Sequence, residues 1–120
     1  MSFLSIFLIW LVALEHLYFL VLEMFFWTKP KGMKSFGLKS KQFAEDTKVL
    51  AANQGLYNGF LAAGLVFSII QSDIKMALFF LSCVTIAGIY GAYSTKQIKL
   101  FYIQSIPAIL AIVSLIINII

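Results

Sequence analysis

Four long apolar segments constrain the fold of this chain more than any other feature of its sequence. Each approaches or exceeds the roughly 20 residues that a helix needs to cross the hydrocarbon core of a bilayer. They cover about residues 3–27, 49–71, 75–94 and 98–120. Since 62% of the 120 residues are hydrophobic and only 12% are charged, a soluble domain of this size has too little interior for them. We therefore expect an all-α integral membrane protein, a four-helix transmembrane bundle that forms a single membrane domain over residues 1–120.

The first long connection, residues 28–48, differs in composition from the segments around it. Its Pro30, Gly32 and Gly37 predict that helical structure is broken there, and its charged side chains need water. The acidic pair 45–46 favours the positive N-terminus of a helix. The helix of the second span is therefore predicted to begin before it enters the membrane.

The basic residues are all lysines, and their positions predict the orientation of the chain. Eight of the nine lie in the connections after the first and third segments, and only Lys75 lies between the second and third. Basic residues accumulate in cytoplasmic loops. Residues 28–48 are therefore expected to form a cytoplasmic loop of a multi-pass membrane protein, with both termini outside. Because topology explains the net charge of +4, no nucleic-acid partner is expected.

Ionisable and polar side chains gather on particular faces of the apolar segments. Glu15, His16 and Glu23 fall within an arc of about 120° on the first segment, since successive residues of a helix are about 100° apart. Ionisable groups in a bilayer core cost at least a few kcal/mol unless they are paired or hydrated, so this arc should face protein. The other segments contribute amide and phenol side chains, mostly at cytoplasmic depth: Asn53, Gln54, Tyr57, Asn58, Tyr90 and Gln104. We expect these groups to meet in one polar chamber that opens toward the cytoplasm.

Purely structural roles are the alternative for each of these residues. Glu23 lies close enough to the interface to pair with Lys29, and the amides can link helices through hydrogen bonds. The single cysteine, Cys83, lies in an apolar stretch, which is typical of packing. Pro107 is expected to bend the last helix. Small residues at four-residue spacing predict close helix contacts at Gly55, Gly59 and Ala63, and at Gly88 and Ala92.

The ionisable residues do not suggest a metal or cofactor site. Glu15, His16 and Glu23 are few, and adjacent residues of a helix point about 100° apart. No second histidine and no cysteine pair complete a ligand set. We expect neither a metal ion nor a cofactor.

Several strings of the sequence carry a resemblance to a known family. "LVALEHLYFLVLEMFFW", "KVLAANQGLYNGFLAAGL", "AGIYGAYS" and "QSIPAILA" resemble the bacterial four-span membrane proteins grouped as domain of unknown function thirteen-zero-four. The similarity runs from Leu11 to about Leu115. It implies a small integral membrane protein with four helices, and it implies no activity.

Three functions agree with these features. The leading hypothesis is proton-coupled transport of a small organic or cationic solute, with Glu15 as the proton and substrate carboxylate and His16 as its relay partner. Because four helices make a narrow bundle, transport would need a homodimer. The second is a membrane-embedded acid–base enzyme, isomerase-like, acting on a lipid or isoprenoid-like substrate. The third is a non-catalytic protein that binds lipid or stabilises the membrane.

Overall fold

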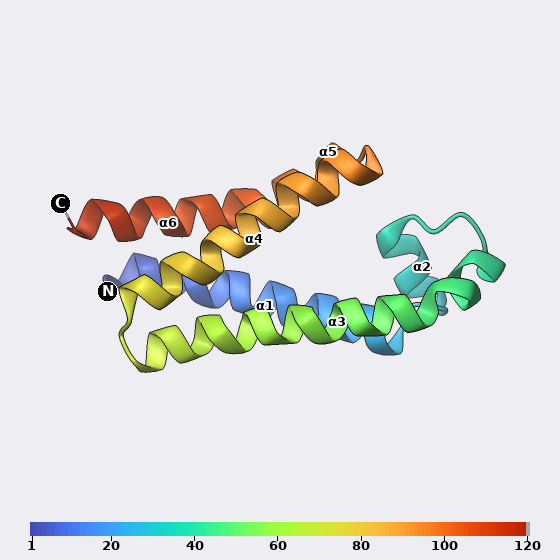
Figure 1. Cartoon of the computed structure of the whole chain (residues 1–120), viewed down its shortest axis with the longest axis horizontal. Coiled ribbons are helices and arrows are strands. Elements are labelled where there is room, and N and C mark those ends of the chain that lie inside the picture. Colours follow the sequence, from blue (N-terminus) through green and yellow to red (C-terminus); the bar gives the residue numbers. More distant parts are fainter. Residues whose placement is uncertain (120) are drawn as a thin grey trace. The chain divides into compact units, whose positions relative to one another are not determined.

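The computed structural model describes residues 1–119, in which helices are joined by short connections and no strand occurs (Figure 1). The prediction of an all-α chain is therefore confirmed. The elements in chain order are α1 (Phe3–Phe25), α2 (Pro30–Phe36), α3 (Lys41–Ile70), α4 (Ile74–Thr95), α5 (Ile98–Leu100), a π-helical segment η1 (Phe101–Ser105) and α6 (Ile106–Ile119).

Three stretches of helix are long and apolar enough to cross a membrane. They are α1, α4 and the helical residues 98–119 formed by α5, η1 and α6. Helix α3 is not among them: it is 30 residues long, but lysines and acids occupy its first turns and amides its middle. It begins at Lys41, before the apolar segment, as the sequence predicts. Three helices with the length and composition of membrane spans are thus confirmed, and the fourth crossing stays a prediction.

The chain divides into two compact units. The first contains Met1–Leu14 and the described residues from Leu61 onward, and the second contains Glu15–Phe60. Helices α1 and α3 each contribute residues to both units.

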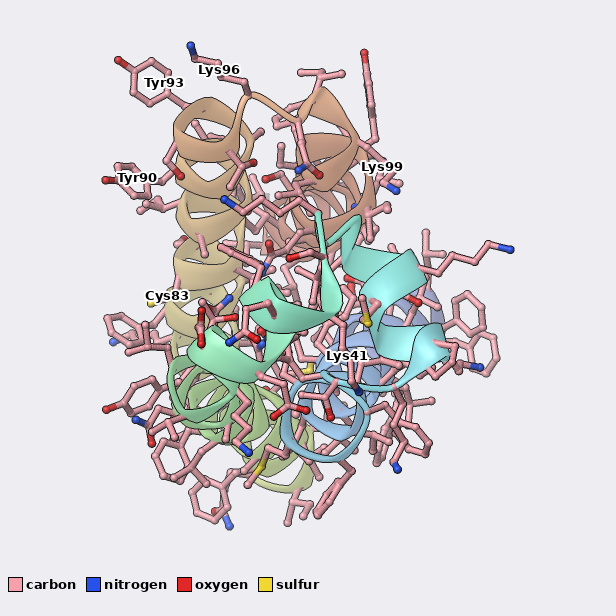
Figure 2. All side chains as sticks on the ribbon, turned by 90° about the vertical axis from the view of Figure 1, so that its right-hand side faces the viewer. Lys41, Cys83, Tyr90, Tyr93, Lys96 and Lys99 are labelled. Carbon is pink, nitrogen blue, oxygen red and sulfur yellow. The ribbon has the colours of Figure 1, made fainter. Side chains whose placement is uncertain are left out.

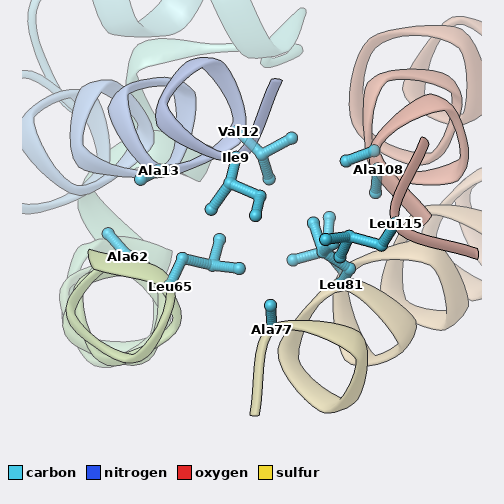
Figure 3. Packing of buried hydrophobic residues seen from close by; sticks show 11 residues of the cluster. Ile9, Val12, Ala13, Ala62, Leu65, Ala77, Leu81, Ala108 and Leu115 are labelled. Carbon is cyan, nitrogen blue, oxygen red and sulfur yellow. The ribbon is translucent and has the colours of Figure 1, made fainter. Parts of the chain in front are cut away.

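The hydrophobic core of the first unit gathers side chains from α1, α3, α4 and α6 (Figure 3). Large aliphatic side chains alternate with alanines, which lets the helices approach one another closely. The larger fully buried members are Ile9, Val12, Leu65, Leu81, Val84 and Leu115, and the alanines are Ala13, Ala62, Ala77, Ala108 and Ala111.

Gly88 of α4 lies directly against η1. A Cβ atom added at Gly88 would overlap Ser105 Oγ and would lie 3.2 Å from the Cβ of Gln104. The close contact predicted at Gly88 is therefore confirmed. The small-residue contact predicted at Ala63 of α3 is wrong, because Ala63 is exposed and its neighbour Ala62 is buried instead.

The loop between α1 and α3 contains a helix that the sequence reading did not predict. Pro30 and Gly32 were expected to break helical structure, but Pro30 occupies the start of α2 and Gly32 lies inside it. The correction has a physical reason: proline suits the first turn of a helix, where its missing N–H is not needed. Gly32 is buried against the carbonyl group of Phe26, so closely that a Cβ atom at this position would overlap the carbonyl oxygen. Gly37 ends the helix in the left-handed conformation, with φ of 62°.

The last helix is irregular where a bend was expected. In η1 the Ile106 N–H donates to the Phe101 carbonyl oxygen, a five-residue step. This widened turn ends just before Pro107, which has no N–H to donate. Such π-helical turns inside α-helices are often found at functional sites.

Candidate functional site

Glu23 and Asn58 form a buried hydrogen-bonded pair between α1 and α3 in the second unit. The Asn58 Nδ2 atom donates to Glu23 Oε1 at 2.5 Å, and the exposed fractions of the two residues are only 9% and 2%. A hydrogen bond to a carboxyl group removes the larger cost of leaving that group buried without a partner. Two of the predicted site residues are therefore brought together.

Two glycines bring α1 and α3 close enough for this pair to form. A Cβ atom at Gly55 would lie 2.8 Å from Met24 Cγ and 3.1 Å from Glu23 Cβ, and one at Gly59 would lie 2.6 Å from Leu20 Cδ1. The predicted small-residue contacts at Gly55 and Gly59 are confirmed. In the second unit, the polar face of α1 thus meets the glycine side of α3.

Glu15 and His16 form a second pair of predicted site residues on α1. The Nδ1 atom of His16 lies 4.0 Å from Glu15 Oε1, and the side chain of His16 is fully buried. The His16 ring also contacts the edge of Phe19, with 5.3 Å between ring centroids. Among the residues that the structure describes, no hydrogen-bond donor reaches Glu15 Oε1, although this atom is itself buried. At 4.0 Å the two groups are beyond hydrogen-bond distance, so a proton can pass between them through one bridging water molecule or after a side-chain rotation brings them closer.

The remaining predicted residues of α3 point away from this contact. Asn53, Gln54 and Tyr57 are exposed, with Tyr57 at 63%, whereas Asn58 is buried. The structure therefore separates one amide of the predicted arc from the other three side chains, because the glycines next to Asn58 form the packed face. The assignment of all four residues to solute binding stays a prediction.

Tyr90 and Gln104 belong to the first unit. Tyr90 is 67% exposed, and its side chain extends outward from α4 together with Tyr93, while Cys83 is half-buried on the same helix (Figure 2). Gln104 is half-buried in η1, where its Cβ lies against Gly88. The assignment of these two residues to solute binding stays a prediction.

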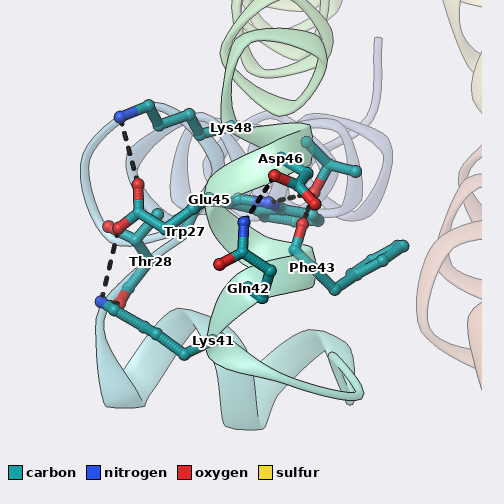
Figure 4. Close-up of polar contacts among 9 residues, drawn as sticks. Trp27, Thr28, Lys41, Gln42, Phe43, Glu45, Asp46 and Lys48 are labelled. Atoms are coloured by element: carbon teal, nitrogen blue, oxygen red, sulfur yellow. Dashed lines mark hydrogen bonds and ion pairs between the residues drawn. The ribbon is translucent and has the colours of Figure 1, made fainter.

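Polar contacts organise the connection between α1 and α3 in the second unit (Figure 4). Trp27 Nε1 donates to Thr47 Oγ1 at 2.9 Å, and Glu45 pairs with Lys41 at 3.7 Å and with Lys48 at 3.1 Å. The hydrogen bond from Lys48 and the positive charges of Lys48 and Lys41 lower the pKa of Glu45. The ammonium group of Lys41 also donates to the Thr28 carbonyl oxygen.

A hydroxyl network in the first unit was missed by the sequence reading. Ser5 and Ser114 are buried and share a hydrogen bond of 2.8 Å between their Oγ atoms. Asn118 donates to Ser2 Oγ at 2.8 Å. Serines in apolar helices commonly bond to their own backbone. Ser5 and Ser114 are separated by 109 positions in the sequence, so no local spacing predicts their contact.

Among residues 1–119, no three histidine, cysteine or carboxylate side chains lie close enough to hold a metal ion. A surface hollow lies at the turn between α3 and α4, lined in part by Phe67, Gln71, Asp73 and Lys75. None of the predicted site residues lines this hollow.

Comparison with known proteins agrees with the resemblance seen in the sequence. A family model described as "Protein of unknown function (DUF1304)" matches residues 10–116. The uncharacterised protein YpaA of Lactococcus lactis subsp. lactis (strain IL1403) is 30% identical over 117 residues, covering 95% of this chain and 98% of YpaA. No solved structure matches the chain.

Proposed function

Since the chain belongs to the DUF1304 family, whose description states no activity, we propose its function from the geometry of its own buried polar residues. The protein is a multi-pass protein of the bacterial cytoplasmic membrane that couples proton movement to the transport of a small organic or cationic solute. Glu15 carries the proton and His16 relays it.

The close packing of α3 on α1 supports four membrane crossings. Gly55 and Gly59 of α3 pack on α1 in the second unit. In the first unit Leu65 of α3 and Val12 of α1 share one core. If α1 crosses the bilayer, a helix packed along both of its halves crosses with it. An even number of crossings, with the lysine-rich loop 28–48 in the cytoplasm, puts both termini outside.

The pair of Glu15 and His16 is the observation that carries the proposal. An ionisable residue inside a membrane helix is expensive and is usually retained for a function. Here the buried Glu15 Oε1 has no hydrogen-bond donor among the described residues and lies 4.0 Å from His16 Nδ1. A group held in this way is ready to accept a proton or to attract a cation.

The other predicted residues have supporting roles in this proposal. Glu23 lies two turns closer to the lysine-rich loop, about 12 Å along the helix from Glu15. With Asn58 as its partner, it guards the cytoplasmic entrance. Asn53, Gln54 and Tyr57 orient the solute from α3, and a second copy of the chain completes the narrow path.

Flux measurements in proteoliposomes test the proposal. The purified protein is reconstituted with a pH-sensitive dye inside, and tetramethylammonium, tetraphenylphosphonium and primary amines are added in turn. We expect at least one of these probes to change the internal pH. Glu15→Gln should abolish the change, because the amide binds no proton, and His16→Gln should slow it.

Glu45→Gln is the matched control, since it makes the same chemical change in the exposed part of α3. It should leave the flux unchanged. A folded Glu15→Gln variant that moves protons as fast as the wild type contradicts the proposal. So does the absence of any proton movement across the full set of probes.

One observation favours a second candidate, acid–base catalysis on a lipid. The Glu15 side chain is 20% exposed, and Leu17 and Tyr18, which follow it on α1 in the same unit, are large exposed hydrophobic side chains. A lipid substrate could reach the carboxyl group from this apolar side. Incubation with an isoprenoid or lipid extract, followed by mass spectrometry, distinguishes the two candidates. Conversion that depends on both Glu15 and His16, in the absence of proton flux, supports the enzyme.

A further inference from the structure

Four lysines of the connection between α1 and α3 have no carboxylate partner among the described residues. Residues 28–48 contain six lysines and two acids, which leaves a net charge of +4. Glu45 is paired with Lys41 and Lys48, and Asp46 accepts a hydrogen bond from Gln42. The lysines without a carboxylate partner are Lys29, Lys31, Lys34 and Lys39, and all four are exposed.

Helix α2 holds two of these lysines in a fixed orientation. Gly32 is buried against the carbonyl group of Phe26, and Met33 and Phe36 are half-buried. Lys31 and Lys34 are three residues apart, so they lie on the same side of the helix. The packed side of α2 thus directs both ammonium groups outward.

Two of these lysines lie close to aromatic rings. Its Nζ atom lies 5.7 Å from the ring centroid of Tyr18, a residue in the second half of the apolar helix α1. Lys39 lies 4.9 Å from the ring centroid of Phe43 in the same manner. Trp27 follows α1 and precedes these lysines in the chain. Its indole N–H donates to Thr47, and its ring packs on Phe36 with 5.0 Å between ring centroids. Aromatic rings and lysines at the end of a membrane helix are typical of the headgroup layer.

We propose that Lys29, Lys31, Lys34 and Lys39 form a binding surface for the headgroups of anionic phospholipids in the cytoplasmic leaflet. The charge of the surface is complementary to a lipid phosphate. Lys31 reaches Tyr18 of α1, and Val21 and Phe25, which follow Tyr18 along this helix, are exposed apolar side chains on which acyl chains can lie. Basic residues next to a membrane helix attract anionic lipids in this way. This inference rests on the proposed cytoplasmic location of residues 28–48, and it is independent of the proposed transport.

Trp27 serves as a reporter of the lipids around this surface. Trp10, the other tryptophan, is removed by Trp10→Phe. The full-length variant is then placed in nanodiscs that contain brominated phosphatidylglycerol or brominated phosphatidylcholine, since bromine quenches tryptophan fluorescence on contact. We expect stronger quenching by phosphatidylglycerol, and we expect this preference to disappear in 1 M NaCl, where the screening length falls to about 3 Å.

Charge-removing variants identify the lysines involved. Changing Lys29, Lys31 and Lys34 to glutamine should reduce the preference for phosphatidylglycerol by about fivefold for each lysine removed at low salt, which leaves only the contribution of Lys39. The matched control changes Lys75, Lys96 and Lys99 to glutamine, which removes the same charge elsewhere. It should keep the preference at Trp27.

Three outcomes overturn the assignment. The first is equal quenching by both lipids in the parent protein. The second is an equal loss of preference in the control variant, since net charge alone would then account for the effect. The third is loss of the preference when inorganic phosphate, a soluble RNA or an acidic peptide is added at low total salt, because the occupant would then be soluble.

Discussion

The two units of the molecule use different kinds of polar side chain inside an apolar chain. In the first unit the buried polar groups are mainly neutral hydroxyls, such as Ser5, Ser105 and Ser114, and each has a hydrogen-bond partner. In the second unit they include Glu23 and His16, which can change charge. Neutral groups bind helices together at every pH, whereas ionisable groups allow chemistry. Under the proposed function, the second unit carries the chemistry, and the buried hydroxyls of the first unit contribute stability.

The largest effect is expected at Gly88 in the first unit. Gly88→Ala places a methyl group on Ser105 Oγ and near the backbone of η1, so we expect a loss of about 1–3 kcal/mol in unfolding free energy. Gly91→Ala is the control on the same helix, because its Cβ would lie 3.8 Å from Leu100 Cδ1. Unfolding in mixed micelles measures the free energy of both variants, and a loss in Gly91→Ala as large as that in Gly88→Ala would contradict the prediction.

Gly55→Ala extends the same test to the second unit. Its Cβ would meet the flexible side chain of Met24 at 2.8 Å, which can move, so the loss should be smaller than at Gly88. Equal losses of unfolding free energy in Gly55→Ala and Gly88→Ala would contradict the expectation that the first unit is packed more rigidly at its glycine.

The next largest loss of unfolding free energy is expected at the buried pair of Glu23 and Asn58. Glu23→Leu leaves the Asn58 amide without its acceptor, and we expect this to cost about 1–3 kcal/mol. Glu23→Leu combined with Asn58→Leu should recover part of the loss, because neither polar group is then buried alone. A double-mutant cycle on unfolding measures the coupling, and additive losses would show that the hydrogen bond contributes nothing.

A smaller effect is expected from the hydroxyl network of the first unit. Ser5→Ala removes the bond to Ser114, and hydrogen bonds between membrane helices contribute about 0.6 kcal/mol on average. The loss should be the same from acid to neutral pH, since a serine hydroxyl does not titrate in that range. Proton flux in proteoliposomes should not change. A loss of flux at unchanged stability would place function in the first unit as well.

The smallest effect is expected at the exposed ion pairs of α3. Because its two lysines lower the pKa of Glu45 from the ordinary value of 4.5, the folded state binds the proton less readily than the unfolded state. The pairs therefore add stability above pH 4.5, and this contribution is lost as the pH falls through the lower value of the folded state. Wild type and Glu45→Gln should differ slightly at neutral pH and low salt, and should converge in acid or in high salt. A difference that persists in strong acid would point to packing.

Much of the helical architecture follows from patterns within single segments. Apolar runs predict α1 and α4 nearly to their ends, because burial in lipid depends mainly on composition and length. Close approach at Gly55 and Gly88 is also predictable, since glycine leaves space beside the backbone. Helix α2 was not predicted from the sequence. Pro30 fits a helix only because it stands in the first turn, and Gly32 does so only because it packs on the Phe26 carbonyl group.

The candidate site shows the same division. The sequence by itself determined that Glu15, His16 and Glu23 share one face of α1, because helical periodicity alone sets that arrangement. Only the tertiary structure decided that Asn58 becomes the partner of Glu23 while Asn53, Gln54 and Tyr57 stay exposed. The reason is steric: the glycines of α3 permit the closest approach to α1, and the rotation that brings them into contact turns the other polar side chains outward.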